Sequence, residues 1–214
     1  MKNNIAILIP AYNEKKTIEK VIKSAAKFGV PLVVDDGSTD STYKKAKACK
    51  AILVRHHFNR GYEEALYSGL IAVKKRKFKY VITIDGDGQH NAQFLRKYIM
   101  EFSRGTEIVL GYRDNYQRPV EILFSIAGRF LWGIRDPLCG MKGYKVSALT
   151  ENLLKKQTNS IGTELSIRSL RMGVKFSQIP IKIKPRKDSS RFGNGFFINL
   201  KMLLNLLILI KKYH

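Results

Sequence analysis

Two aspartates and a glutamine follow an apolar segment at a spacing that suits a metal ion. Asp85, Asp87 and Gln89 occur at i, i+2 and i+4, with glycines between them. In an extended segment alternate side chains point the same way, so two carboxylates and an amide oxygen would converge. An incomplete set of hard oxygen ligands suits Mg²⁺ or Mn²⁺, with substrate phosphates and water completing the shell. The alternative is a turn without a ligand, because turns favour these residues.

A second acidic pair, Asp35 and Asp36, precedes Gly37 and Ser38. Its alternative interpretation is a turn leading into a helix that Ser38 or Thr39 caps. Like charges repel unless a cation or hydrogen-bond donors join them. Two such pairs in a basic chain therefore favour a functional site over two unrelated turns.

Strand and helix patterns alternate along the first half and would bring these acids together. Short apolar runs, typical of strands buried on both faces, are separated by helical spacing; they are Ile5–Ile9, Leu32–Val34, Ile52–Val54, Val81–Ile84 and Ile108–Leu110. Repeated βα units predict an α/β fold with a mostly parallel sheet and helices on both faces. Each polar cluster follows a strand, and ligands of such sheets bind outside the carboxyl ends of the strands.

The second half of the chain is less regular. We expect a helix over Val120–Ile134 that is apolar nearly all round and contains Arg129, a helix over Glu164–Met172, and a strand over Ile179–Ile183. A long apolar helix follows from Asn194 to Lys212. The division predicted is a catalytic domain over 1–193 and a C-terminal helix over 194–214.

Charge is the unusual feature of the composition. The 214 residues include 39 Lys and Arg against 17 Asp and Glu, a net charge of +22. Such a field favours polyanions: nucleic acid, anionic membrane or phosphorylated substrates. Compositional drift toward Lys, Asn and Ile is the alternative. Hydrophobic residues at 44% exclude wholesale disorder. The two cysteines, Cys49 and Cys139, form no zinc or disulfide framework.

Several motifs resemble those of the inverting, GT-A-fold glycosyltransferases of family two. They are Ile9–Glu14 (IPAYNE), Val34–Asp40 (VDDGSTD) and Asp85–His90 (DGDGQH). The closer likeness is to the dolichyl- and polyprenyl-phosphate sugar transferases, because Asp136–Lys142 (DPLCGMK) is similar to a segment of that branch and Arg186–Arg191 to its late basic loop. The motifs follow the family order from residue 9 to residue 191.

The resemblance implies a role for each of these residues. Pro10, Tyr12, Glu14 and Asp36 would hold the nucleotide base and ribose, and Asp85 would sit near the ribose and the metal. Asp87 and Gln89 would hold Mg²⁺ or Mn²⁺ on the diphosphate, where the metal offsets charge on the departing group. Arg113 and Arg129 would contact an acceptor phosphate. Arg186 and Arg191 would close over the phosphates.

The sequence departs from the family pattern in three places. Glu63 stands where the Asn59–Ala65 segment would have a second glycine. Asp188 and Ser189 stand where the late loop expects a glycine and a variable residue. The transmembrane helices of many polyprenyl-phosphate members are not expected, since no stretch of about 20 apolar residues occurs.

The acceptor decides which catalytic groups are needed. A sugar hydroxyl usually needs a general base, for which Asp136 is the preferred candidate. A lipid phosphate is already ionised and needs cations instead, and Asp136 would then orient the phosphate or the basic residues. We expect Asp87, Asp136 and Arg113 to be the catalytic residues. His90 would assist near the metal.

These observations predict a metal-dependent enzyme that moves a sugar from a nucleotide diphosphate-sugar to a polyprenyl phosphate. The alternative acceptor is a glycan hydroxyl in capsule or lipopolysaccharide synthesis. The non-enzymatic alternative is a basic nucleic-acid-binding domain, favoured by the run Lys74–Lys79. A simpler interpretation of that run is that it places cations at the end of a helix, where the helix dipole favours them. The sequence also has no recognised nucleic-acid reading module. Nucleic acid is therefore not an expected partner.

The residue pattern of the C-terminal apolar helix predicts how the protein associates with a membrane. The core from 196 to 210 would be about 22 Å long at about 1.5 Å per residue, too short to span a hydrocarbon layer of about 30 Å. Asn194, Lys201, Asn205 and Lys212 fall on one helical face, which suits a segment lying in an anionic membrane interface. We expect a peripheral protein on the cytoplasmic face of the membrane. The alternatives are a buried helix and a homo-oligomer contact.

Overall fold

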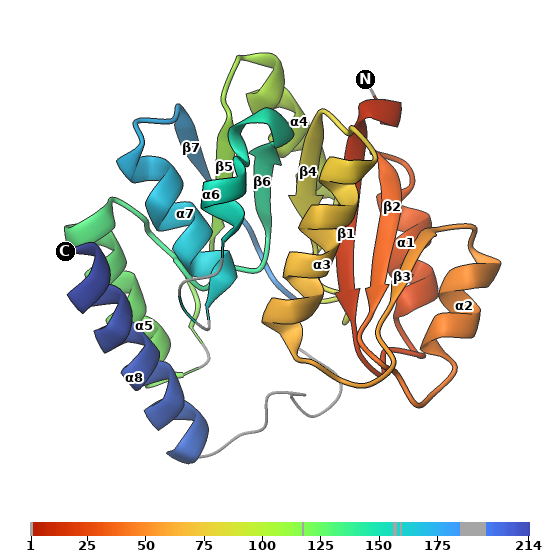
Figure 1. Cartoon of the computed structure of the whole chain (residues 1–214), viewed down its shortest axis with the longest axis horizontal. Helices are drawn as coiled ribbons and strands as arrows, with labels where there is room; N and C mark the ends of the chain where they lie inside the picture. The colour runs from red at the N-terminus through yellow and green to blue at the C-terminus, as the bar shows by residue number, and fades with distance from the viewer. Residues whose placement is uncertain (1, 117, 156–157, 159, 185–195) are drawn as a thin grey trace.

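A seven-stranded sheet forms the centre of the molecule (Figure 1). The computed structural model describes residues 2–116, 118–155, 158, 160–184 and 196–214. The strand order is β3-β2-β1-β4-β6-β5-β7. The strands are β1 Ile5–Ala11, β2 Val30–Asp35, β3 Ile52–Arg55, β4 Tyr80–Thr83, β5 Ile108–Tyr112, β6 Lys142–Lys145 and β7 Phe176–Pro180. All neighbouring pairs are parallel except those made by β6, which runs antiparallel to β4 and β5. The α/β fold with a mostly parallel sheet is confirmed.

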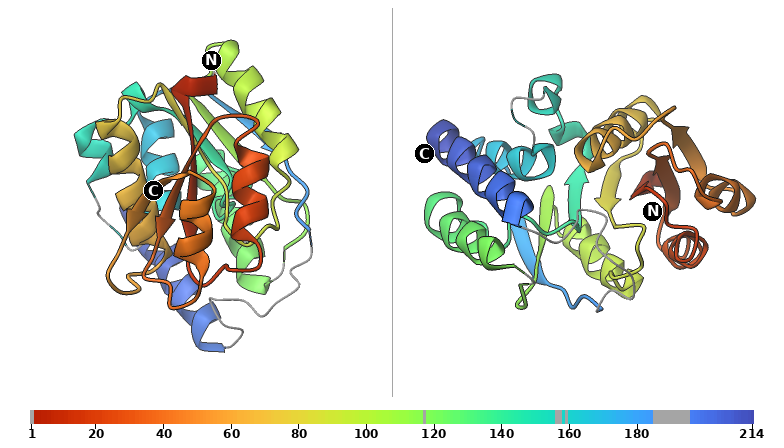
Figure 2. Two further views of the ribbon diagram at one scale, coloured as in Figure 1. Left: turned by 90° about the vertical axis from the view of Figure 1, so that its right-hand side faces the viewer. Right: turned by 90° about the horizontal axis from the view of Figure 1, so that it is seen from below.

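Helices cover both faces of this sheet (Figure 2). They are α1 Ile18–Ala25, α2 Thr42–Ala48, α3 Tyr62–Lys75, α4 Leu95–Ser103, α5 Pro119–Ala127, α6 Glu151–Leu154, α7 Ile161–Arg171 and α8 Phe196–Tyr213. Short 3₁₀ turns occur at Lys2–Asn4, Ala92–Phe94 and Val146–Ala148, and a π-helical turn at Gly128–Trp132 follows α5. The predicted Val120–Ile134 helix is thus α5 extended by this turn.

Alternation along the strands divides the core into two hydrophobic clusters. In β1, Ala6 and Leu8 join a cluster with α3, α5, α6, α7 and α8. Ile5, Ile7 and Ile9 join a cluster with α1, α2 and α4. All seven residues of β1 are buried, as expected for a central parallel strand.

The apolar pattern did not predict helix α6, and it placed the last strand at Ile179–Ile183, with its start three residues after that of the observed β7. Strand β6 was not predicted either. It has the sequence Lys-Gly-Tyr-Lys and lies between β4 and β5. Gly143 is required there, since a Cβ at this position would come within 2.8 Å of the rings of Tyr98 and Phe102. The strand therefore depends on long-range packing rather than on a local apolar run.

The C-terminal helix α8 packs beside α5 and α7 (Figure 1). Leu206, Leu209 and Tyr213 are buried against the main core. The hydroxyl of Tyr213 donates to Glu164 Oε1 at 2.6 Å, and Trp132 Nε1 donates to the Tyr213 carbonyl at 3.1 Å. One face of α8 thus belongs to the fold, while the division into 1–193 and 194–214 stays a prediction.

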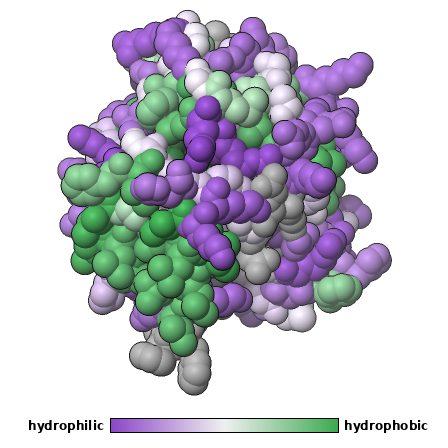
Figure 3. All heavy atoms as spheres, turned by 60° about the vertical axis from the view of Figure 1, so that its left-hand side comes forward, coloured by the Kyte–Doolittle hydropathy of each residue, from purple (hydrophilic) through white to green (hydrophobic). Residues whose placement is uncertain are grey.

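The outer sides of α5 and α8 form a continuous hydrophobic surface, green in Figure 3. We call it the α5–α8 face. Its exposed members are Ile122, Leu123, Ile126, Phe130, Leu200, Leu204, Leu207 and Ile208. Phe130 is the most exposed of them at 84%. Among the described residues, no helix is both long enough and apolar enough to cross a membrane.

Candidate active site

The polar loops that follow β1, β2, β3 and β4 lie at one edge of the sheet, at the bottom of Figure 1. These strands are mutually parallel, so their carboxyl ends point the same way. Asn13 joins two of the loops, because its side-chain oxygen accepts from Thr39 N at 2.9 Å and its own N–H donates to Ser38 Oγ at 3.0 Å. The edge predicted from the sequence is therefore a single cluster of loops.

Asp85 lies where three segments meet at this edge. The hydroxyl of Tyr62, at the start of α3, donates to Asp85 Oδ1 at 3.3 Å. The Nδ1 atom of His90 lies 3.3 Å from Asp85 Oδ2. A Cβ on Gly140 would come within 2.6 Å of the same oxygen, so the backbone of the segment just before β6 lies against this carboxylate. Burial raises the pKa of Tyr62, and the charge of Asp85 raises it further.

Asp87 and Gln89 form the rest of the predicted metal set. Asp87 Oδ1 accepts from Gln89 N at 2.9 Å, which shapes the turn. Gln89 Nε2 donates to the Lys184 carbonyl at 3.1 Å, and His90 forms a bridge with Ile183. Among the described residues no three acidic, histidine or cysteine side chains converge as a complete metal centre. Two carboxylates with an amide oxygen fit Mg²⁺ or Mn²⁺ only if a substrate supplies the remaining ligands.

Asp36 is buried and fastens the loop that follows β3. Its Oδ1 lies 2.6 Å from His56 Nδ1 and accepts from Arg60 N at 3.0 Å, while Oδ2 accepts from Gly61 N at 2.8 Å. His56 Nε2 lies 2.9 Å from Ser68 Oγ. Asp36 thus positions the Asn59–Gly61 turn, and a direct contact with ribose stays a prediction. His56 and Ser68 have no signal in sequence spacing.

Asp35 is fully buried and differs from its neighbour. Its Oδ2 lies 3.2 Å from Arg55 Nε, and the Arg55 guanidinium sits 4.2 Å from the Tyr43 ring centroid. Neither carboxylate oxygen has a well-aligned hydrogen bond among the described residues. Asp35 therefore depends on one half-exposed arginine for its compensation.

The other predicted nucleotide ligands lie on β1 and the loop after it. Pro10 is buried in β1 opposite Val34, and Tyr12 is partly exposed. Glu14 is buried, and its Oε2 accepts from Thr17 Oγ1 at 3.2 Å. The loop is therefore prearranged at the sheet edge, and nucleotide contact by these residues stays a prediction.

Arg113 and Asp136 form a buried bidentate pair beyond the end of β5. Arg113 Nε donates to Asp136 Oδ2 at 2.6 Å and Nη2 donates to Oδ1 at 3.0 Å. Glu121, in the first turn of α5, lies 3.5 Å from Arg113 and 3.6 Å from Arg118. Burial alone would lower the pKa of Arg113, but the hydrogen bonds to Asp136 outweigh it and raise that pKa. Both oxygens of the Asp136 carboxylate are thus hydrogen-bonded to Arg113.

Of the remaining predicted phosphate ligands, the structure describes Arg129. Arg129 is exposed on the π-helical turn that follows α5. Arg186 and Arg191, with Asp188 and Ser189, lie outside the described residues. Glu121 was missed by sequence reasoning, although an acid in a first helical turn is a recognisable signal.

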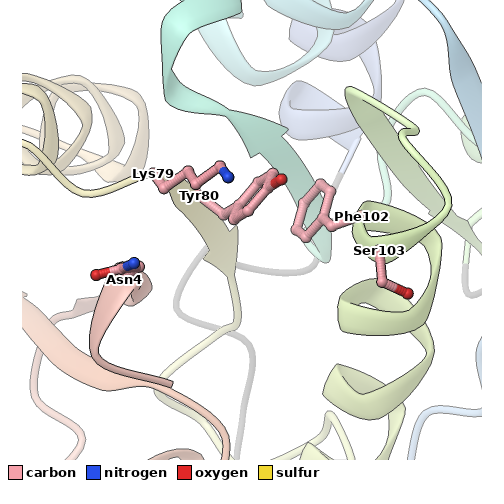
Figure 4. A pocket seen from close by; sticks show the side chains of 5 residues that line it. All are labelled: Asn4, Lys79, Tyr80, Phe102 and Ser103. Atoms are coloured by element: carbon pink, nitrogen blue, oxygen red, sulfur yellow. The ribbon is translucent and has the colours of Figure 1, made fainter. Parts of the chain in front are cut away.

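A hollow on the other side of the molecule is not part of this site. Figure 4 shows its lining of Asn4, Lys79, Tyr80, Phe102 and Ser103. Tyr80 begins β4 and Asn4 precedes β1, so the hollow lies at the amino ends of these strands. The rings of Tyr80 and Phe102 stack at 4.4 Å between centroids. It is far from the acidic loops and carries none of their chemistry.

Comparison with known proteins assigns this arrangement to a family. The family model described as "Glycosyl transferase family 2" matches residues 6–149. The chain belongs to glycosyl transferase family 2. This glycosyltransferase is 30% identical to protein MJ1222 of Methanocaldococcus jannaschii, over 97% of its own length and 92% of that protein. It is 26% identical to UDP-N-acetylglucosamine--dolichyl-phosphate N-acetylglucosaminyltransferase of Methanococcus voltae, covering 96% and 95% of the two chains.

A solved structure supports the same fold for the glycosyltransferase. Glucosyl-3-phosphoglycerate synthase of Mycobacterium tuberculosis, crystallised with Mn²⁺, UDP and glucosyl-3-phosphoglycerate, superposes with a TM-score of 0.73. Its sequence identity is 21%, and the match covers 95% of this chain and 78% of that one. The GT-A-type fold expected from the sequence is thereby confirmed.

Proposed function

We propose that this family 2 glycosyltransferase moves a sugar from a nucleotide diphosphate-sugar to a polyprenyl phosphate, with inversion at the anomeric carbon. An oxygen of the ionised lipid phosphate would form the new bond to that carbon while the bond to the nucleotide diphosphate breaks on the opposite side. The observation that carries the choice of acceptor is the Arg113–Asp136 pair. It would place a guanidinium beside the acceptor, and both oxygens of the carboxylate that a hydroxyl acceptor would need as a base are already hydrogen-bonded to that guanidinium.

The relatives support this proposal on both substrates. The Methanococcus voltae relative is named for a UDP-sugar donor and a dolichyl phosphate acceptor. The Mycobacterium tuberculosis structure was crystallised with UDP and Mn²⁺. In this chain Asp85, Asp87 and Gln89 would hold Mg²⁺ or Mn²⁺ on the donor diphosphate. The ion would act as a Lewis acid toward the leaving group.

The chain's own residues would carry the rest of the mechanism. Asp36 holds the Asn59–Gly61 turn, which would contact the donor, and the Tyr62 hydroxyl donates to Asp85. Arg113, fixed in a single orientation by Asp136 and Glu121, would position the acceptor phosphate. Arg129, Arg186 and Arg191 would add further positive charge around it. Because these groups are prearranged, little reorganisation accompanies transfer.

A transfer assay with a panel of donors and acceptors tests the proposal. We expect sugar transfer to a polyprenyl phosphate in the presence of Mn²⁺ and none in excess EDTA. Arg113→Ala should raise the acceptor KM while leaving nucleotide affinity nearly unchanged. Transfer to a glycan hydroxyl but not to the lipid phosphate would favour the alternative acceptor instead. Salt-sensitive DNA binding without any transfer would favour the non-enzymatic alternative.

We propose further that the α5–α8 face rests on the anionic cytoplasmic surface of a membrane. Large side chains on both helices supply hydrophobic area, led by Phe130, Leu204 and Leu207. Exposed cations on α8 and on the turn after α5 would attract anionic lipid; they are Lys201, Lys211, Lys212 and Arg129. In a two-fold dimer the same surface would meet itself, and these cations would approach one another. Charge therefore favours lipid over a second copy.

Vesicle sedimentation distinguishes a membrane from a second copy of the protein as the partner of the α5–α8 face. Leu207→Glu with Phe130→Glu should abolish co-sedimentation with anionic vesicles, because both charges would enter the interface. Met172→Glu is the matched control, since Met172 is 60% exposed but lies off this face, at the end of α7. Loss of binding in the control as well, or a stable dimer in light scattering that the double variant dissociates, would contradict the membrane assignment.

A further inference from the structure

Glu63 occupies the second position of α3 but interacts with the start of a different helix. Its Oε2 accepts a hydrogen bond from Gly162 N at 3.0 Å, and Gly162 is the second residue of α7. The N-cap residue of α7, Ser160, makes no side-chain capping bond. Glu63 therefore caps α7 across 99 positions of sequence. A carboxylate is favourable there, because backbone N–H groups at a helix start lack partners within the helix.

The backbone carbonyl of Gly162 accepts a hydrogen bond from a buried lysine. Lys142, at the start of β6, is 5% exposed, and its Nζ donates to the Gly162 carbonyl at 2.6 Å and to the Pro137 carbonyl at 2.8 Å. Thr163 Oγ1 donates to the same Pro137 carbonyl at 3.0 Å. The start of α7 is therefore fastened to the 136–142 segment on one side and to α3 on the other.

This arrangement connects the two halves of the candidate active site. At the α3 end, Tyr62 precedes Glu63 and contacts Asp85, and the preceding turn is held by Asp36. At the other end, Pro137 follows Asp136, which fixes Arg113. A continuous series of residues thus joins the two ends, and each member either contacts the next directly or is its neighbour in the chain. The series is Asp85, Tyr62, Glu63, Gly162, Lys142 and Pro137.

We infer that Glu63 is a positioning residue that sets the 136–142 segment, and with it the Arg113–Asp136 pair, relative to Asp85. The inference rests on the proposed function in taking that pair as the acceptor side. Glu63 does not touch the reacting atoms. It acts through Gly162, and its negative charge lies close to the ammonium group of Lys142. The glycine that the family pattern has at this position offers no such link.

Kinetics of two Glu63 variants test this role. Glu63→Ala removes the cap and should raise the acceptor KM roughly 10-fold to 100-fold, since small misplacements of positioning groups have effects of that size. The KM for the nucleotide sugar should change less than threefold. Glu63→Gln keeps an accepting oxygen and should restore most of the activity. Glu19→Ala is the matched control, because Glu19 is likewise the second residue of its helix, α1, but is exposed.

A double variant and hydrogen exchange complete the design. Lys142→Met added to Glu63→Ala should raise the acceptor KM no further than the larger single effect, since both residues act through Gly162. Backbone amides of residues 136–142 should exchange faster in Glu63→Ala, a readout that needs no acceptor. Equal changes in both KM values, or a lowered melting temperature with unchanged kinetics and exchange, would overturn the inference. If wild-type protein fails to use the lipid phosphate but residues 136–142 still exchange faster in Glu63→Ala than in wild type, only the proposed acceptor is refuted.

Discussion

Lys142 should give the folding stability a pH dependence that can be isolated by subtraction. Burial lowers its pKa from an ordinary value near 10.5 to about 8, and the charges of Glu63 and Asp136 oppose that shift only in part. Between these values the unfolded chain holds a proton that the folded chain has released, so stability rises with pH in this window. From pH 7 to pH 9.5 the gain amounts to about 2 kcal/mol in the free energy of unfolding.

The assay is urea denaturation of wild type and Lys142→Met at closely spaced pH values. Other lysines and the tyrosines contribute to both proteins, so the difference between the two curves reports Lys142 alone. The free energy of unfolding of the wild type should increase relative to that of Lys142→Met as pH rises from 7 to 9.5. Lys145→Met is the control on the same strand: Lys145 is partly exposed, and a hydrogen bond to Glu107 raises its pKa, so its curve should show no such gain. A flat or falling difference for Lys142→Met would refute the reasoning.

Three further changes have definite expected outcomes. Asp87→Asn should leave the melting temperature unchanged and lower transfer by roughly 10²–10³, the usual effect of losing one electrostatic stabiliser; near-normal transfer in excess EDTA would contradict the metal role. Gly140→Ala should abolish transfer in the same assay, because its Cβ would lie 2.6 Å from Asp85 Oδ2; full activity would show that this carboxylate can move freely. Tyr213→Phe removes the bond to Glu164 and should lower the free energy of unfolding by about 1.5 kcal/mol in urea; an unchanged value would mean that this hydrogen bond does not stabilise the docking of α8.

The apolar strands and the sheet edge were predictable because their signals are local. Ile5–Ile9 and Val81–Ile84 are apolar runs of strand length, and a parallel sheet brings the residues after them to one edge. The partners within the site were not predictable in this way. The Arg113–Asp136 pair spans 23 positions and the Asp36–His56 contact spans 20, so each depends on where separate elements are placed.

Strand β6 and helix α8 show the same limit in the fold. The four residues of β6 include two lysines and a glycine, a composition that predicts a loop. They form a strand because β4 and β5 leave a gap that antiparallel pairing fills. In α8 a helix was correctly expected, but only packing decides that Leu206 and Leu209 are buried while Leu204 and Leu207 are exposed.

The insertion of β6 between β4 and β5 also has a consequence for how the protein assembles. Strands β1, β2, β3 and β4 precede residue 84 and can pair with one another as soon as they are synthesised. Strand β5 has no place beside β4 until β6, more than 25 residues later, has paired with both. We expect the first four strands to form an early folding unit and β5, β6 and β7 to join together in a later, slower step. The boundary between these two units runs between Asp85 and Gly140, so the candidate site is completed only when folding is complete.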